Sequence, residues 1–118
     1  MNQDFFNFMI ISIIVAMIFQ WNIVKSMAAT SGWAASTGLS TVGNDQASNN
    51  SSGFSALPGG FRTDLGVFSQ VSSGSFWWCS TESSAYHAWN RCINNSYSSV
   101  IRGEGGEMAG FSVRCIKD

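Results

Sequence analysis

The chain has 118 residues, enough for one domain, and a formal net charge of −1 with only 11% charged residues. This weak charge argues against a nucleic-acid-binding face and against a charged disordered tail, whereas an aromatic content of 14% indicates a folded chain. The 12 glycines, together with abundant Ser and Asn, favour a loop-rich fold over a helical bundle.

Residues 1–24 form a hydrophobic segment that differs in composition from the rest of the chain. The run from Phe5 to Phe19 is apolar except for Asn7 and Ser12, and it predicts an N-terminal hydrophobic helix. Three interpretations stay open: a signal peptide or membrane anchor, an aberrant N-terminus of a truncated gene product, and a buried helix.

The flanks of this segment give mixed signals about export. No Lys or Arg precedes Lys25, so the positive region of a signal peptide is missing, yet Ser26-Met27-Ala28 offers small residues suited to a cleavage site. We expect the protein to be exported, to the cell surface or outside a bacterial cell. Membrane association through residues 5–24 is an accompanying expectation.

The rest of the chain predicts five or six short strands joined by long loops. Residues 26–53 are rich in Ser, Thr, Gly and Asn and predict a surface loop pinned by Trp33. Pro58-Gly59-Gly60 predicts a turn. The predicted extended segments follow at Phe61-Arg62, Leu65–Val71, Gly74–Ser80, Ala85–Ile93, Val100–Arg102 and Gly110–Ile116.

The stretch from Gly74 to Glu82 is the expected anchor of the fold. Adjacent residues of a strand point to opposite faces, so Trp77 and Trp78 require cover on both sides of their sheet. Gly103–Glu107 is expected to be a flexible acidic loop, and the C-terminal strand is expected to face inward. The predicted structural core is Trp33, Phe54, Trp77, Trp78, Trp89, Phe111 and Val113.

Four aromatic-rich blocks in order resemble the Fibrobacter succinogenes major paralogous domain. A Lys-Ser segment at Lys25 and a Gly-Trp pair ending at Trp33 precede them, so the resemblance covers about residues 25–118, the C-terminal part of that domain. The apolar run stands where the family has its N-terminal half, which suggests a partial domain or truncated paralogue. The blocks are Ser52–Arg62, Phe76–Glu82, Ala88–Arg91 and Gly110–Asp118.

The resemblance implies an α+β, loop-rich fold similar to C-type-lectin-like and formylglycine-generating-enzyme folds, with short antiparallel strands after the hydrophobic helix. Cys79 stands where the family commonly has Ser, and neither Cys79 nor Cys92 fits the usual pattern. We expect these two to lie on adjacent strands and to form a disulfide that stabilises the fold by about 3 kcal/mol.

The candidate catalytic residues are few. His87 is the only histidine and has no nucleophile signature around it, and Cys115 is expected to be structural. The cysteine spacings match no zinc pattern, and the sugar-binding calcium motifs of lectins are missing. We therefore expect no catalytic residue, no metal and no cofactor.

A segment rich in Tyr and Asn is the candidate ligand-binding face, because such residues combine rigid rings with adaptable hydrogen bonding. We expect a non-enzymatic binding module that recognises a protein or glycan partner and no nucleic acid. The alternative is an enzyme related to formylglycine-generating sulfatase-modifying factors. The candidate ligand-binding residues are Tyr86, His87, Asn90, Asn94, Asn95 and Tyr97.

Overall fold

A computed structural model describes residues 23–115. The predicted hydrophobic helix of residues 1–24 lies outside the described residues, apart from its last two positions. Among the residues described, no helix is long and apolar enough to span a membrane. The elements are α2 (Ile23–Met27), the 3-10 turn η1 (Gln46–Ser48), β1 (Phe61–Arg62), β2 (Phe68–Ser69), β3 (Gly74–Ser84), β4 (His87–Asn94) and β5 (Ile101–Gly106).

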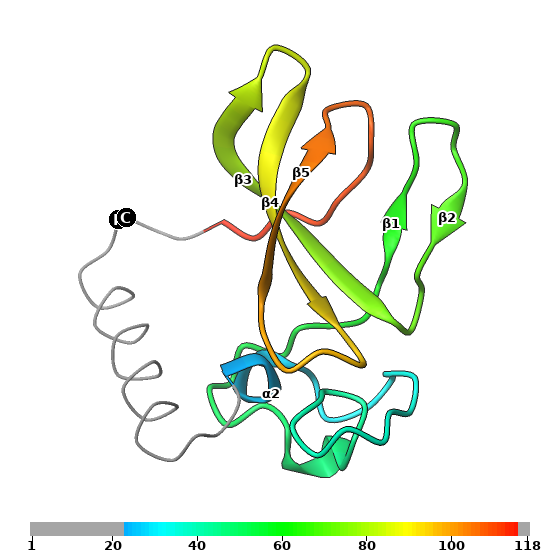
Figure 1. Ribbon diagram of the computed structural model, residues 1–118, viewed down its shortest axis with the longest axis vertical. Helices are drawn as coiled ribbons and strands as arrows, with labels where there is room; N and C mark the ends of the chain where they lie inside the picture. The colour runs from blue at the N-terminus through cyan, green and yellow to red at the C-terminus, as the bar shows by residue number, and fades with distance from the viewer. Residues whose placement is uncertain (1–22, 116–118) are drawn as a thin grey trace, which may run out of the picture.

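The expectation of an α+β, C-type-lectin-like fold is wrong. The described chain is mainly antiparallel β-structure and loop, and its only helical elements are the five-residue α2 and the three-residue η1. Strand order is β3-β4-β5 in one sheet, and β1-β2 forms a separate hairpin that stands beside it (Figure 1). The physical reason is composition, since Ser, Gly and Asn interrupt helices while the aromatic segments favour strands.

The sheet is built around β3, as its aromatic run predicts. Phe76 lies opposite Cys92 and Trp78 opposite Asn90, and the register shifts between Trp78 and Glu82. This irregularity lengthens β3 relative to β4. Trp77 packs against the main core on one face, whereas Trp78 stacks on Phe111 on the other. The prediction that both faces are covered is confirmed.

The main core lies on the Trp77 face, between the sheet, α2 and the loop that precedes β1. Met27, Phe54, Trp77 and Val100 pack around its edge. Trp33 and Phe54 were predicted as core residues, and both occupy this region. The buried members are Val24, Ala28, Trp33, Val42, Ala56 and Ile93.

The long loop that precedes β1 is held by polar side chains. Asn49 is buried, and its amide donates to the carbonyls of Ala29 and Val42, at 3.1 Å each. The Gln46 side chain accepts from the backbone N–H of Trp33 at 3.0 Å and donates to its carbonyl at 2.8 Å. Such bonds order a loop whose composition provides little apolar surface.

The prediction that Gly103–Glu107 is a flexible loop is wrong, because β5 continues to Gly106. Gly105 lies opposite Ala88 on the Trp78 face of the sheet. A Cβ atom there would lie 2.8 Å from the Phe111 ring and 3.0 Å from the Trp78 ring. Glycine is therefore used in this strand to let two rings approach the backbone.

The predicted C-terminal strand Gly110–Ile116 is also wrong over its described part. Only isolated bridges form there, from Gly110 to Arg62 and from Ser112 to Trp77. Ser112 uses both backbone groups on β3, donating to the Phe76 carbonyl and accepting from the Trp78 N–H. Beyond it the chain leaves the sheet, so Val113 is 69% exposed instead of belonging to the core.

The predicted disulfide is not formed, since Cys79, Cys92 and Cys115 are all free. Cys92 lies opposite Phe76, and Cys79 is three residues further along β3. That offset is about 10 Å along a strand. It exceeds the Cα separation of about 7 Å that a disulfide can span.

Candidate binding groove

An aromatic cluster covers the Trp78 face of the sheet. The Trp78 and Phe111 rings stack with centroids 4.3 Å apart, and Phe76 lies 5.5 Å from Phe111. Phe61 of β1 packs edge-on against Phe76 and Phe111, at 4.9 and 5.6 Å. Edge-on and offset arrangements of this kind add about 0.5–1.5 kcal/mol per pair beyond buried area. The cluster thus holds the β1–β2 hairpin beside the sheet.

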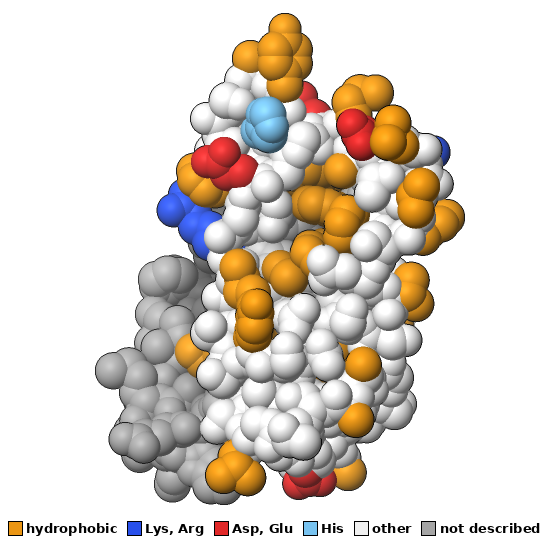
Figure 2. Space-filling view, turned by 45° about the vertical axis from the view of Figure 1, so that its right-hand side comes forward, with side chains coloured by type: hydrophobic (Ala, Val, Ile, Leu, Met, Phe, Trp, Pro, Cys, Tyr) orange, Lys and Arg blue, Asp and Glu red, His pale blue; other side chains and the backbone are white. Residues whose placement is uncertain are grey.

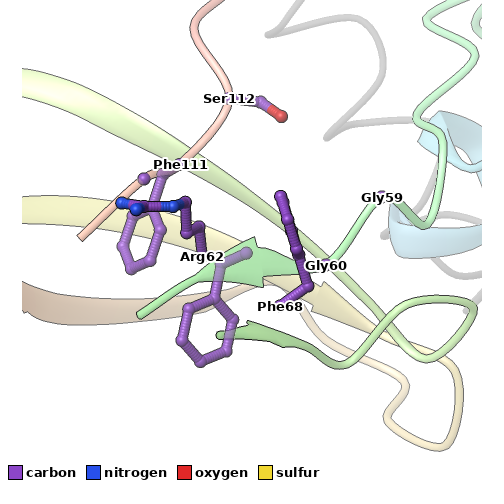
Figure 3. Close-up of a pocket in the computed structure, with 8 residues that line it drawn as sticks. Gly59, Gly60, Arg62, Phe68, Phe111 and Ser112 are labelled. Carbon is purple, nitrogen blue, oxygen red and sulfur yellow. The ribbon is translucent and has the colours of Figure 1, made fainter. Parts of the chain in front are cut away.

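A groove of about 310 Å³ opens where the hairpin meets the 110–112 segment. Figure 3 shows the Arg62 side chain and the rings of Phe68 and Phe111 around it. Pockets of ~300–1,000 Å³ with apolar walls and a few polar groups are typical small-ligand sites. The lining residues are Gly59, Gly60, Phe61, Arg62, Phe68, Gly110, Phe111 and Ser112.

The backbone geometry of the groove depends on Gly60. Its φ is +67°, and a Cβ there would clash with the Ser69 carbonyl and the Val71 nitrogen. On the opposite wall, Arg62 and Gly110 exchange two backbone hydrogen bonds, of 2.9 and 2.8 Å. These contacts place two separate segments of the chain, at Gly59–Arg62 and Gly110–Ser112, against each other.

Exposed apolar side chains lie on and next to the hairpin that lines the groove. Phe68 lines the groove and is 72% exposed, and Leu65 at the hairpin turn is 86% exposed. Val67 in the same hairpin turn and Val71 in the turn between β2 and β3 are exposed as well. Figure 2 shows apolar side chains gathered over the upper part of the molecule, while the lower part is mainly white. Exposed apolar surface that is grouped in this way marks an interaction site more often than scattered residues do.

A family model described as the Fibrobacter succinogenes major domain matches residues 16–117. The chain belongs to this family. The match contains every described strand and the whole groove, and it begins within the segment expected to be hydrophobic and separate. No curated protein and no solved structure matches the chain. Membership of the Fibrobacter succinogenes major domain family identifies the domain and assigns it no activity.

The groove comes from two of the four blocks that carry the family resemblance. Gly59–Arg62 belongs to the first block, and Gly110–Ser112 belongs to the fourth. Phe76 and Trp78 of the second block form the aromatic cluster behind it. Three of the four blocks thus lie at or behind the groove, and Phe68 joins them from outside the blocks.

The predicted ligand-binding residues do not form one surface. Tyr86 and His87 lie at the start of β4, and Asn94, Asn95 and Tyr97 lie at or beyond its end. An eight-residue strand separates its ends by about 23 Å. Tyr86, His87 and Tyr97 are exposed.

The asparagines of this set have structural contacts. Asn90 is buried, and the Asn95 amide donates to the Ala34 carbonyl at 3.2 Å. The Asn94 side chain accepts from the backbone N–H of Ser96 at 3.0 Å and from its hydroxyl at 2.8 Å. Asn90 is therefore removed from the surface, Asn95 links the turn after β4 to the loop at Ala34, and Asn94 closes that turn.

The remaining candidate core residues lie in different surroundings. Trp78 and Phe111 form the aromatic cluster rather than the main core. Trp89 is half-buried on the opposite face of the sheet, with the Arg102 guanidinium 3.7 Å from its ring centroid. Sequence periodicity gave no indication of the aromatic cluster, because its members come from three separate segments, at Phe61, Phe76–Trp78 and Phe111.

The titratable groups of residues 23–115 include one histidine and three cysteines. No set of three or more His, Cys, Asp or Glu side chains is grouped there as a metal site. His87 Nδ1 lies 3.1 Å from Ser84 Oγ, with both residues exposed near the β3–β4 turn. Burial raises the pKa of the Cys92 thiol to about 11, which keeps it protonated and unreactive at neutral pH.

Proposed function

We propose that this chain is a non-enzymatic binding module that acts at the surface of the bacterial cell or outside it. The groove between the hairpin and the 110–112 segment recognises a protein or glycan ligand. The observation that carries the proposal is the exposed Phe68 ring beside an aromatic-walled hollow that also contains the Arg62 side chain.

The composition of the groove supports recognition of a neutral or weakly polar ligand. Three phenyl rings supply apolar contact area, and Arg62 supplies directional hydrogen-bond donors. Large aromatic rings offer much contact area for little loss of side-chain entropy, so they are common anchors of binding surfaces. Backbone hydrogen bonds join β1 to β2 and to the 110–112 segment, and walls held in this way lose little entropy when a ligand binds.

Two probes test the proposal: an array of neutral cell-wall oligosaccharides and a display library of random peptides. Compounds selected by the wild-type protein are then titrated, with tryptophan fluorescence as the readout because Trp78 stacks on Phe111 in the groove wall. We expect Phe68→Ala to weaken binding by about tenfold, since burying a Phe side chain contributes about 1.5–3 kcal/mol.

Leu39→Ala is the matched control, because Leu39 is also highly exposed but lies outside the groove. It should leave the affinity unchanged. Equal binding by Phe68→Ala and wild type, or no selected compound from either probe, would contradict recognition at the groove. Mass spectrometry of the bound compounds checks the proposal that the module is non-enzymatic. Chemical conversion of any bound compound would contradict it.

A further inference from the structure

Three of the arginines lie on the sheet face opposite the groove. Arg91 of β4 and Arg102 of β5 are direct cross-strand partners, so their side chains share a face. Trp77 of β3 lies opposite Arg91 on that face and contacts Phe54, and the Arg114 guanidinium lies 3.9 Å from the Phe54 ring centroid. We call Arg91, Arg102 and Arg114 the basic row.

The direct pairing of Arg91 with Arg102 is electrostatically unfavourable. Like charges placed opposite each other on adjacent strands repel and destabilise the sheet. Arg102 lies over the Trp89 ring, and Arg91 donates to the Asn90 carbonyl at 3.3 Å. Neither guanidinium is paired with a carboxylate of residues 23–115, although Glu104 lies on the same face, opposite Trp89. Glu104 therefore offsets the repulsion only in part, because it forms no direct ion pair with either guanidinium.

The basic row is accessible to a ligand. Arg91, Arg102 and Arg114 are all exposed, and Figure 2 shows basic side chains gathered mainly on one flank of the molecule. Two of the guanidiniums are held over aromatic rings, which orients them and reduces the entropy lost on binding. A guanidinium presents paired donors that match the two oxygens of a carboxylate.

The geometry of the row indicates a ligand with repeated charge. The row runs across the sheet, with Arg102 on β5 and Arg91 on β4. Trp77 occupies the next position on β3, and Arg114 follows on the segment that bridges to the other edge of β3. Neighbouring strands lie about 4.8 Å apart. A chain of uronate sugars advances by a comparable length per residue and carries one carboxylate per sugar, so its density of negative charge is comparable to the spacing of Arg91 and Arg102.

We propose that the basic row is a second binding site, which takes the carboxylates of an acidic polysaccharide of the uronate type. The ligand lies across the strands, and its carboxylates accept hydrogen bonds from Arg91 and Arg102 while a further one reaches Arg114. This site is separate from the groove, which lies on the Trp78 face. Binding there relieves the repulsion between Arg91 and Arg102.

The test uses the full chain and an oligogalacturonate probe in low-salt buffer, with a neutral galacto-oligosaccharide of equal length as the reference. We expect the uronate to bind, and its affinity to fall as salt is added. Arg91→Gln combined with Arg102→Gln should weaken uronate binding at least about tenfold, since the variant loses the charge-assisted hydrogen bonds of two guanidiniums.

Arg62→Gln is the control, because it removes one charge from the groove and leaves the basic row intact. Arg62→Gln should change the affinity for the uronate by less than about twofold. Phe68→Ala should do the same, so that the test of the basic row is independent of the groove. In low salt, Arg91→Gln alone should raise the melting temperature relative to Arg62→Gln, a readout that needs no ligand.

Several outcomes would overturn the proposal. Equal uronate binding by the double variant and wild type would show that the arginines are not the site. If the neutral sugar bound as tightly as the uronate, the carboxylates would not be what the site recognises. Tighter binding of an oligoglutamate of matched charge would assign the row to an acidic protein segment instead.

Discussion

Gly105 shows how a single residue controls the packing of the aromatic cluster. The Trp78 and Phe111 rings lie so close to its backbone that an added methyl group would fall within 3.0 Å of both. Gly106, the next residue, has no atom near the position of an added Cβ. The two glycines therefore serve different purposes although they are adjacent in sequence.

We expect Gly105→Ala to destabilise the protein by about 1–3 kcal/mol, the usual cost of forcing extra volume into a packed site. The rings must separate, which also widens the groove wall at Phe111. Gly106→Ala is the matched control and should change stability by less than about 0.5 kcal/mol. Urea unfolding of the two variants checks this, and equal midpoints would contradict the packing of rings over β5.

Helix α2 matters as an element because it closes the main core and anchors a loop. Val24 and Ala28 are fully buried, and the Lys25 ammonium donates to the carbonyls of Thr41, Asn44 and Asp45. Burial lowers the pKa of Lys25, and the Asp45 carboxylate partly offsets that effect. Cleavage after Ala28, which the small residues at 26–28 favour, would remove this whole arrangement.

Lys25→Met should destabilise the protein by roughly 1–2 kcal/mol, because three carbonyls lose a charged donor. The loss should be local, so hydrogen exchange should quicken first for the Gly43 and Asn44 amides. Thermal melting and exchange measured by mass spectrometry check the two effects. A variant with wild-type melting and unchanged exchange in residues 41–45 would show that the ammonium does not hold the loop.

The elements differ in how far the sequence could predict them. The aromatic run of β3 and the opposite faces of Trp77 and Trp78 follow from strand alternation. The extent of β5 does not follow from the sequence. Arg102–Gly105 contains two glycines and two charged residues, a composition typical of a loop, and only the structure shows the rings that pack over Gly105. The groove was also unpredictable, since hairpin packing brings Phe68 and Phe111 together across distant sequence positions.

Over the whole molecule, one sheet separates two packed regions that share no residues. The main core lies on the Trp77 face, and the aromatic cluster lies on the Trp78 face. Neither region contains a covalent link between segments, because the three cysteines are free. Stability thus depends on packing and on the polar contacts of the loops.

Reduction should accordingly leave the fold unchanged. We expect the same melting temperature with and without dithiothreitol, and three free thiols by mass spectrometry. Exposed Cys115 should react first with iodoacetamide at pH 8, and Cys92 last, because it is buried and its pKa is raised to about 11. A fall in melting temperature on reduction, or rapid labelling of Cys92, would contradict this arrangement.

The alternation of glycine and charged residues in β5 also disfavours self-association through this strand. β5 is the last strand of its sheet in the described chain, so its outer backbone groups are available to pair with another molecule. In such edge-to-edge pairing, the charged side chains of Arg102 and Glu104 would lie against the second molecule. Gly103 and Gly105 would contribute no side chain to the contact. The strand that lets two rings approach the backbone is, for the same reason, a poor template for aggregation.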